Sequence, residues 1–250
     1  MHHDSRAVLE SFAWGFVAAA SLIAGGAFAL RFGVAERTLG MVMAFGSGVL
    51  ISAVAFELVQ EAFDKEGGRG SVALGLFAGS ATFYVGDLLI DRMGGEHRKH
   101  SGGRQAEGSA LAIVLGIVLD GIPESLVLGL TIVVTGSVSA AFVVAVALSN
   151  VPEAFAASTG LAQAGWATRR ILGLWTGVAL VSGLAALVGF AVFDSASQGT
   201  IAFVLSFAGG AILTMLADTM MPEAFEHGGK LVGVVTTFGF ALAFAISALE

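Results

Sequence analysis

The sequence predicts an all-α integral membrane protein with eight transmembrane helices. Of its 250 residues, 56% are hydrophobic and 12% are charged, whereas soluble domains have about 25% charged residues. The mean hydropathy is +0.87. Apolar runs recur along the chain at close to the roughly 20 residues that a helix needs to cross a bilayer. Cysteine is absent, which excludes disulfides and thiolate metal sites, and there is no basic patch that would indicate nucleic-acid binding.

In chain order, the first apolar run has no basic segment before it, so it is interpreted as a span and not as a cleaved signal. After the third run, a charged segment over 91–108 predicts a solvated loop, and its His97 and His100 are interpreted as solvated. The other connections are short, so residues 1–250 form one polytopic domain. The predicted spans are 11–31, 39–60, 71–90, 109–134, 139–163, 168–193, 200–222 and 229–249.

Lys and Arg are unevenly distributed between the two sets of loops. One side has Arg31, Arg37, Arg92, Arg98, Lys99, Arg104, Arg169, Arg170 and Lys230, and the other has Arg6, Lys65 and Arg69. Cytoplasmic loops are enriched in these residues. The asymmetry therefore predicts a cytoplasmic loop after span 3 and both termini outside; chance asymmetry is the alternative. The expected location is the cytoplasmic (inner) membrane of a prokaryote.

An internal repeat relates two parts of the chain at a constant offset of 162 residues. The repeat relates span 2 to span 7, five spans later, and a shift by an odd number of spans reverses the orientation of a helix in the membrane. This predicts inverted repeats, spans 1–3 and 6–8, around an antiparallel pair of spans 4 and 5, an arrangement typical of secondary transporters. Chance alignment of small and apolar residues is the alternative. The matches include Phe45/Phe207, Gly48/Gly210, Glu61/Glu223, Ala62/Ala224 and Phe63/Phe225.

Two similar blocks lie near the middle of spans 4 and 5, and each contains a Pro-Glu pair. They read DGIPES over 120–125 and SNVPEA over 149–154. Residues four apart share one face of a helix, so the first and fifth residues of each block lie together. No Lys or Arg lies well inside any span, so a proton or a bound metal must balance these acids. The predicted metal ligands are Asp120, Glu124, Ser149, Asn150 and Glu153.

Proline adds backbone oxygens to this site. Pro123 and Pro152 lack an N–H, which frees the carbonyl one turn earlier, here that of Leu119 or Leu148. Two helices broken at proline would then offer carboxylate, hydroxyl, amide and carbonyl oxygens to a cation. The alternative is a pair of simple proline kinks with each glutamate capping a neighbouring helix.

Further acids are interpreted as pathway relays. Glu57 and Glu61 lie at the predicted outer mouth, whereas Asp218 and Glu223 lie near the predicted cytoplasmic mouth. Ordinary interfacial carboxylates are an equally good interpretation of these four residues.

These residues resemble the ZIP (Zrt/Irt-like) divalent metal transporters over essentially all eight spans. The resemblance rests on the two Pro-Glu blocks, on Met221-Pro222-Glu223-Ala224 in span 7, and on a degraded copy of that pattern over 57–62 in span 2. It implies an eight-helix fold with a metal site between spans 4 and 5.

The sequence departs from the family pattern at the ligands. The span-4 block usually reads His-Asn-x-Pro-Glu-Gly, and the span-5 block usually begins with His or with Gln-Asp; here they begin with Asp120 and with Ser149-Asn150. The Ser-Gly-x-x-Glu-Pro of many relatives is replaced in span 6 by SGLAAL over 182–187. The second metal position therefore looks lost. An oxygen-only site suits Mn more than Zn.

The sequence thus predicts a transporter that moves a divalent metal toward the cytoplasm by alternating access, with Zn, Mn, Fe or Cd as candidate substrates and no organic cofactor. Its expected partners are metal ions and the lipid bilayer, not nucleic acid; whether it forms a homodimer stays open. The alternative is a non-transporting ZIP-like homologue that acts as a metal sensor or a structural protein. An intramembrane enzyme is disfavoured, because no catalytic group with a recognisable context lies within the spans.

Overall fold

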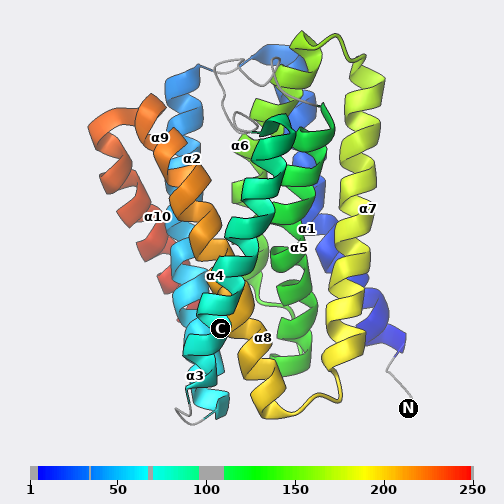
Figure 1. Ribbon diagram of the computed structural model, residues 1–250, viewed down its shortest axis with the longest axis vertical. Coiled ribbons are helices and arrows are strands. Elements are labelled where there is room, and N and C mark those ends of the chain that lie inside the picture. Colours follow the sequence, from blue (N-terminus) through cyan, green and yellow to red (C-terminus); the bar gives the residue numbers. More distant parts are fainter. Residues whose placement is uncertain (1–4, 34, 67–69, 96–109, 249–250) are drawn as a thin grey trace.

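The computed structural model describes residues 5–33, 35–66, 70–95 and 110–248, and within these ranges every regular element is a helix (Figure 1). The long helices stand side by side in one bundle. The α-helices are α1 (Ser5–Phe32), α2 (Glu36–Ala53), α3 (Glu61–Glu66), α4 (Ser71–Ile90), α5 (Ala110–Thr135), α6 (Ala140–Gln163), α7 (Thr168–Phe193), α8 (Gln198–Met215), α9 (Met221–Gly228) and α10 (Val232–Ser247).

Among the described residues, seven helical stretches are long and apolar enough to cross a membrane. This supports a multi-pass membrane protein. The last stretch, Gln198–Ser247, is 50 residues long, and the chain changes direction within it. Gly229 has a φ of 64°, a conformation that glycine adopts without strain. After it, α10 runs back beside α2 (Figure 1).

The helix bounds follow the predicted apolar runs closely. α4 and α7 coincide with the runs at 71–90 and 168–193, and α5 and α6 agree with theirs to within one residue. The main differences are extensions. α1 begins at Ser5 instead of residue 11. The predicted loop 91–108 begins with a π-helical turn, η2 (Asp91–Gly95), and its residues 96–108, with His97 and His100, lie outside the described residues.

Two helices contain a π-helical segment in their middle. α2 continues into η1 (Val54–Gln60) and then α3, and α8 continues into η4 (Leu216–Met220) and then α9. Pro222 lies in the first turn of α9, directly after η4, so this proline falls where the helix changes from π- to α-helical geometry. Pro123 and Pro152 differ from expectation, because α5 and α6 continue as α-helix through them. The two prolines do not interrupt their helices.

The helices pack as two groups (Figure 1). α1 packs against α6 and α7, and α5 packs against α7; in the other group α2 packs against α10 and α9, and α4 packs against α8. The groups meet where α2 contacts α6 and where α5 contacts α8. This contact zone contains the largest buried apolar cluster, which includes Leu50, Leu128, Phe142 and Leu205.

Candidate metal site

The five predicted ligands face the interior of the bundle. Asp120 and Glu124 lie on α5, whereas Ser149, Asn150 and Glu153 lie on α6, and none of them is more than 6% exposed. The four-residue spacing explains their common direction, since residues one helical turn apart lie on the same face. Three carboxyl groups are therefore buried within a small part of two neighbouring helices.

One contact joins the two helices at this level. The Ser149 hydroxyl lies 3.4 Å from Glu124 Oε1 and donates a 2.9 Å hydrogen bond to the Val146 carbonyl on its own helix. A hydroxyl has one hydrogen and two acceptor lone pairs, so it can serve only one of these oxygens at a time. A carboxylate and a hydroxyl oxygen thus face each other between α5 and α6, which is an arrangement that a cation can bridge.

Asn150 is directed elsewhere. Its side-chain amide donates to the Ala18 carbonyl on α1 at 3.4 Å. The amide nitrogen therefore links the site to α1. This contact joins residues 132 positions apart in the chain, so sequence spacing gave no indication of it.

Glycines hold the proline block of α6 from two sides. A Cβ atom on Gly25 of α1 would lie 2.8 Å from the Val151 carbonyl oxygen, and one on Gly46 of α2 would lie 3.3 Å from that of Leu148. Leu148 carries the carbonyl that Pro152 leaves without its helical donor. The Gly46 backbone thus lies close to that oxygen, where a weak Cα–H···O contact can form. The approach of Gly25 requires the absence of a side chain, whereas a Cβ at Gly46 would be accommodated by a shift of a few tenths of an ångström.

A complete set of strong metal ligands is not assembled here. Among the described residues, no three or more His, Cys, Asp or Glu side chains are grouped so that they could hold a metal ion. In this conformation Asp120, Glu124 and Glu153 do not converge as a three-carboxylate site. An ion at this level would need hydroxyl, amide or backbone oxygens in addition to the acids, or a shift of α5 relative to α6.

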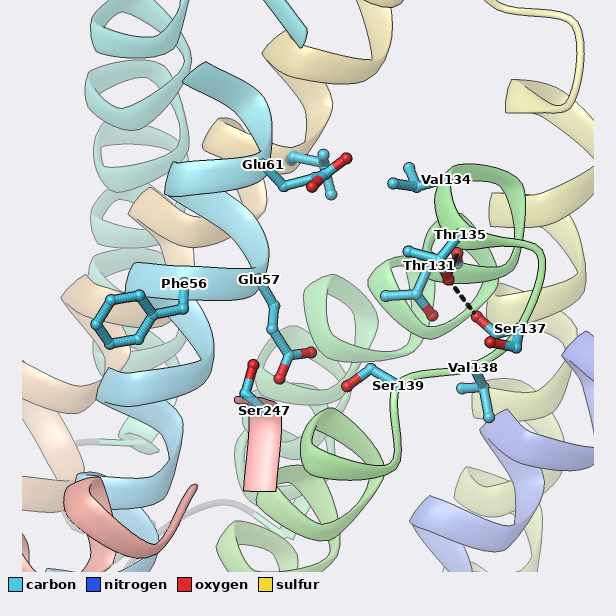
Figure 2. Close-up of a pocket in the computed structure, with 11 residues that line it drawn as sticks. Phe56, Glu57, Glu61, Thr131, Val134, Thr135, Ser137, Val138, Ser139 and Ser247 are labelled. Carbon is cyan, nitrogen blue, oxygen red and sulfur yellow. Dashed lines mark hydrogen bonds between the residues drawn. The ribbon is translucent and has the colours of Figure 1, made fainter. Parts of the chain in front are cut away.

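The two predicted relays on the η1–α3 segment line a cavity. Glu57 and Glu61 lie on one wall of a space of about 540 Å³, opposite hydroxyl groups from α5 and from the α5–α6 connection (Figure 2). Glu61 also forms an ion pair with Lys65 at 3.2 Å. Among the described residues, its lining consists of Phe56, Glu57, Glu61, Thr131, Val134, Thr135, Ser137, Val138, Ser139, Leu205 and Ser247.

The two predicted relays of span 7 differ in environment. Asp218 is exposed, whereas Glu223 is 7% exposed. Glu223 Oε1 lies 3.9 Å from Nε2 of His227, whose Nδ1 lies 3.6 Å from Glu36 Oε2 on α2. His227 and Glu36 are absent from the predicted site. The i,i+4 spacing of Glu223 and His227 could have indicated their contact, but only the packing of α9 on α2 brings in Glu36.

A scan against protein-family models and a search of curated proteins each find no match for this chain. The assignment of a function therefore depends on the residues and their arrangement.

Proposed function

We propose that this protein is a divalent metal transporter of the ZIP type, which moves its ion across the membrane toward the cytoplasm by alternating access. In the ion-bound state α5 would shift relative to α6, so that Asp120, Glu124 and Glu153 hold the ion between these helices with Ser149 as a weaker ligand. Asn150 helps to position this site through its bond to α1. Mn²⁺ is the preferred probe, because carboxylate and hydroxyl oxygens suit it.

The approach of Glu124 to Ser149 carries this proposal. Two Pro-Glu blocks from neighbouring helices meet, with all of their predicted ligands buried. Acidic side chains inside a membrane protein are costly and usually mark an ion or proton path. No Lys or Arg occurs between residues 110 and 163, which include both helices. The charge that balances these acids would therefore come from outside these two helices, and a divalent ion supplies it.

The helix bounds support the inverted repeat. Adding 162 to residues 36 and 53, the ends of α2, gives 198 and 215, the ends of α8. Adding 162 to residue 54, where the π-helical segment η1 starts, gives 216, where η4 starts. In this proposal the reversal at Gly229 separates spans 7 and 8, which makes eight spans in total.

The glycine contacts are also reciprocal. Gly48 of α2 approaches the Thr236 carbonyl of α10, and its repeat partner Gly210 of α8 approaches the Leu76 carbonyl of α4. In return, Gly239 of α10 approaches Phe45, and Gly79 of α4 approaches Phe207, which is 45 + 162. The third helix of the first repeat, α4, thus packs against the second helix of the other repeat, α8, and α10 packs against α2 in the same way. This exchange forms two pairs, α2 with α10 and α4 with α8, and contacts of η1 and α3 with α8 and of α9 with α2 join the pairs into one unit.

Alternating access would then be a movement of α1, α5, α6 and α7 against that unit. The candidate ligands all belong to the first of these groups. The contacts between the groups are the less extensive ones, so sliding there disrupts less packing than it would within either group. The excess of Lys and Arg at one end of the bundle favours that end as the cytoplasmic one.

Uptake by proteoliposomes tests the proposal. Purified protein should carry Mn²⁺ into liposomes, and Glu124→Gln or Glu153→Gln should reduce uptake at least tenfold, about the effect of 1.4 kcal/mol, while elution and melting stay unchanged. The matched control is Glu10→Gln, because Glu10 is exposed on α1. Uptake by both Gln variants at the rate of the unmodified protein would refute the assigned site.

One observation favours the alternative of a non-transporting homologue that senses metal. The described residues contain no group of three or more His, Cys, Asp or Glu placed to hold an ion. A sensor would bind Mn²⁺ in detergent and change its protease sensitivity, but it would give no uptake above that of protein-free liposomes.

A further inference from the structure

The cavity beside Glu57 has the lining of a cation site. Its volume is about 540 Å³, and it lies between η1–α3, the end of α5 and the beginning of α6 (Figure 2). None of the described residues that line it is Lys, Arg or His. Two carboxyl groups and hydroxyls from three separate elements contribute oxygen atoms, and oxygen is the ligand atom of hard divalent cations.

The cavity is large enough for an ion that keeps its water. Six waters at about 30 Å³ each occupy roughly 180 Å³, well below the volume of the cavity. A hydrated ion binds through hydrogen bonds from its water to surrounding oxygens, so it needs acids and hydroxyls at some distance, not a tight cage. In Figure 2 the Glu57 carboxylate points into the space toward Ser139 and Ser247.

The π-helical geometry of η1 helps to place Glu57 there. A π-helical turn contains more residues than an α-helical turn, so it changes the direction of the side chains within it, and such turns are frequent at functional sites. Glu57 lies in the middle of η1, while Glu61, four residues later, starts α3. Both acids line the same cavity, and their four-residue spacing favours a common direction in an ordinary α-helix as well.

This cavity is separate from the Glu124 site. Thr131, on its wall, is seven residues from Glu124 along α5, about 10 Å at 1.5 Å per residue, and on nearly the same face. Leu128 and Phe142 lie in the buried cluster in this region and are no more than 1% exposed. A packed apolar layer thus lies between the cavity and the buried acids of α5 and α6.

We propose that this cavity is a second cation site, which binds a hydrated divalent ion through Glu57 and Glu61 and through the hydroxyls of Thr131, Thr135, Ser139 and Ser247. It collects the ion before the apolar layer opens toward Glu124. The divalent nature of the ion and its onward movement rest on the proposed function, whereas binding in the cavity does not require transport.

Lys65 gives the proposal a test in the opposite direction. Its ammonium group is paired with Glu61 at 3.2 Å, so it reduces the negative charge that Glu61 presents to the cavity. Removal of this positive charge with Lys65→Gln should strengthen cation binding. A purely structural role for the Glu61–Lys65 pair predicts no gain.

The experiment measures Mn²⁺ binding to the purified full chain in detergent by electron paramagnetic resonance, which distinguishes free from bound Mn²⁺. The Glu124→Gln/Glu153→Gln variant removes the α5–α6 site, so any binding that remains reports the cavity. In this background, Glu57→Gln should weaken binding about tenfold and Lys65→Gln should strengthen it about threefold, as expected for one unit charge within several ångströms of a divalent ion. Asp64→Asn is the matched control, because Asp64 is exposed on α3 and does not line the cavity.

The outcomes separate the two proposals. If the Glu124→Gln/Glu153→Gln variant binds no Mn²⁺, or if Glu57→Gln and Asp64→Asn have equal effects, the cavity site is refuted. If Glu57→Gln fails to fold, the Lys65→Gln variant decides, since unchanged or weaker binding contradicts the proposal. If the cavity binds Mn²⁺ as expected but liposomes show no uptake, the transport function fails and the cavity site stands.

Discussion

Shortening Glu124 by one methylene tests whether its contact with Ser149 serves ion binding. In Glu124→Asp the carboxylate withdraws by about 1.5 Å, the length of one C–C bond. The 3.4 Å separation from the Ser149 hydroxyl would then become about 4.9 Å, beyond hydrogen-bond distance. The shortened carboxylate and the Ser149 hydroxyl could then no longer both reach one ion between α5 and α6. Loss of one oxygen ligand should raise the half-saturating Mn²⁺ concentration about tenfold, the effect of about 1.4 kcal/mol.

The assay is Mn²⁺ uptake by proteoliposomes over a range of concentrations, with Ser149→Ala and the double variant in parallel. Ser149→Ala should also raise the half-saturating concentration about tenfold. The double variant should stay near tenfold, because both changes remove the same contact. Glu10→Asp, an equal shortening at an exposed position, is the control. An effect of about a hundredfold in the double variant would show that the two residues act independently and would refute the reasoning.

Three other predictions follow from metal chemistry and from packing. Zn²⁺ and unlabelled Mn²⁺ should inhibit the uptake of labelled Mn²⁺ at concentrations that differ by no more than about tenfold in favour of Zn²⁺, because the ligands are oxygens. A much larger preference for Zn²⁺ would count against the proposed ligand set. Trp175→Phe should lower the free energy of unfolding by about 2 kcal/mol, because the substitution removes the donor to the buried Ser158 hydroxyl. In detergent this variant should melt at a lower temperature than the control Trp14→Phe, and equal melting temperatures would show that this bond contributes little. Gly48→Ala and Gly210→Ala should reduce the yield of folded protein to a similar extent, whereas Gly177→Ala, which has open space around it, should not; unequal losses at Gly48 and Gly210 would argue against their equivalence in the repeat.

Hydropathy predicted the helices because a bilayer requires long apolar runs. The bounds of α4 and α7 agree with prediction. The start of α1 does not, because its first turns contain Arg6 and Glu10 and remain helical beyond the apolar run. Hydropathy marks the part of a helix in contact with lipid and does not detect its polar extension.

Periodicity also predicted which residues of the candidate site lie together. The four-residue spacing placed Asp120 with Glu124 on one buried face of α5. What it could not predict are contacts that depend on the packing of distant helices. The bond from Asn150 to Ala18 and the pair of Glu36 with His227 are of this kind. The continuation of α5 through Pro123 was also missed, because a proline inside a membrane helix is tolerated when neighbours satisfy the freed carbonyl.

The wide turns η1 and η4 also have a consequence for insertions and deletions. Each accommodates about one residue more than an α-helix of the same length. Loss of a single residue from Val54–Gln60 would convert the turn to ordinary α-helix, and the flanking segments would keep their depth in the membrane. The same deletion within α4 would rotate every later side chain by about 100°, and so would move its lipid-facing residues into the bundle.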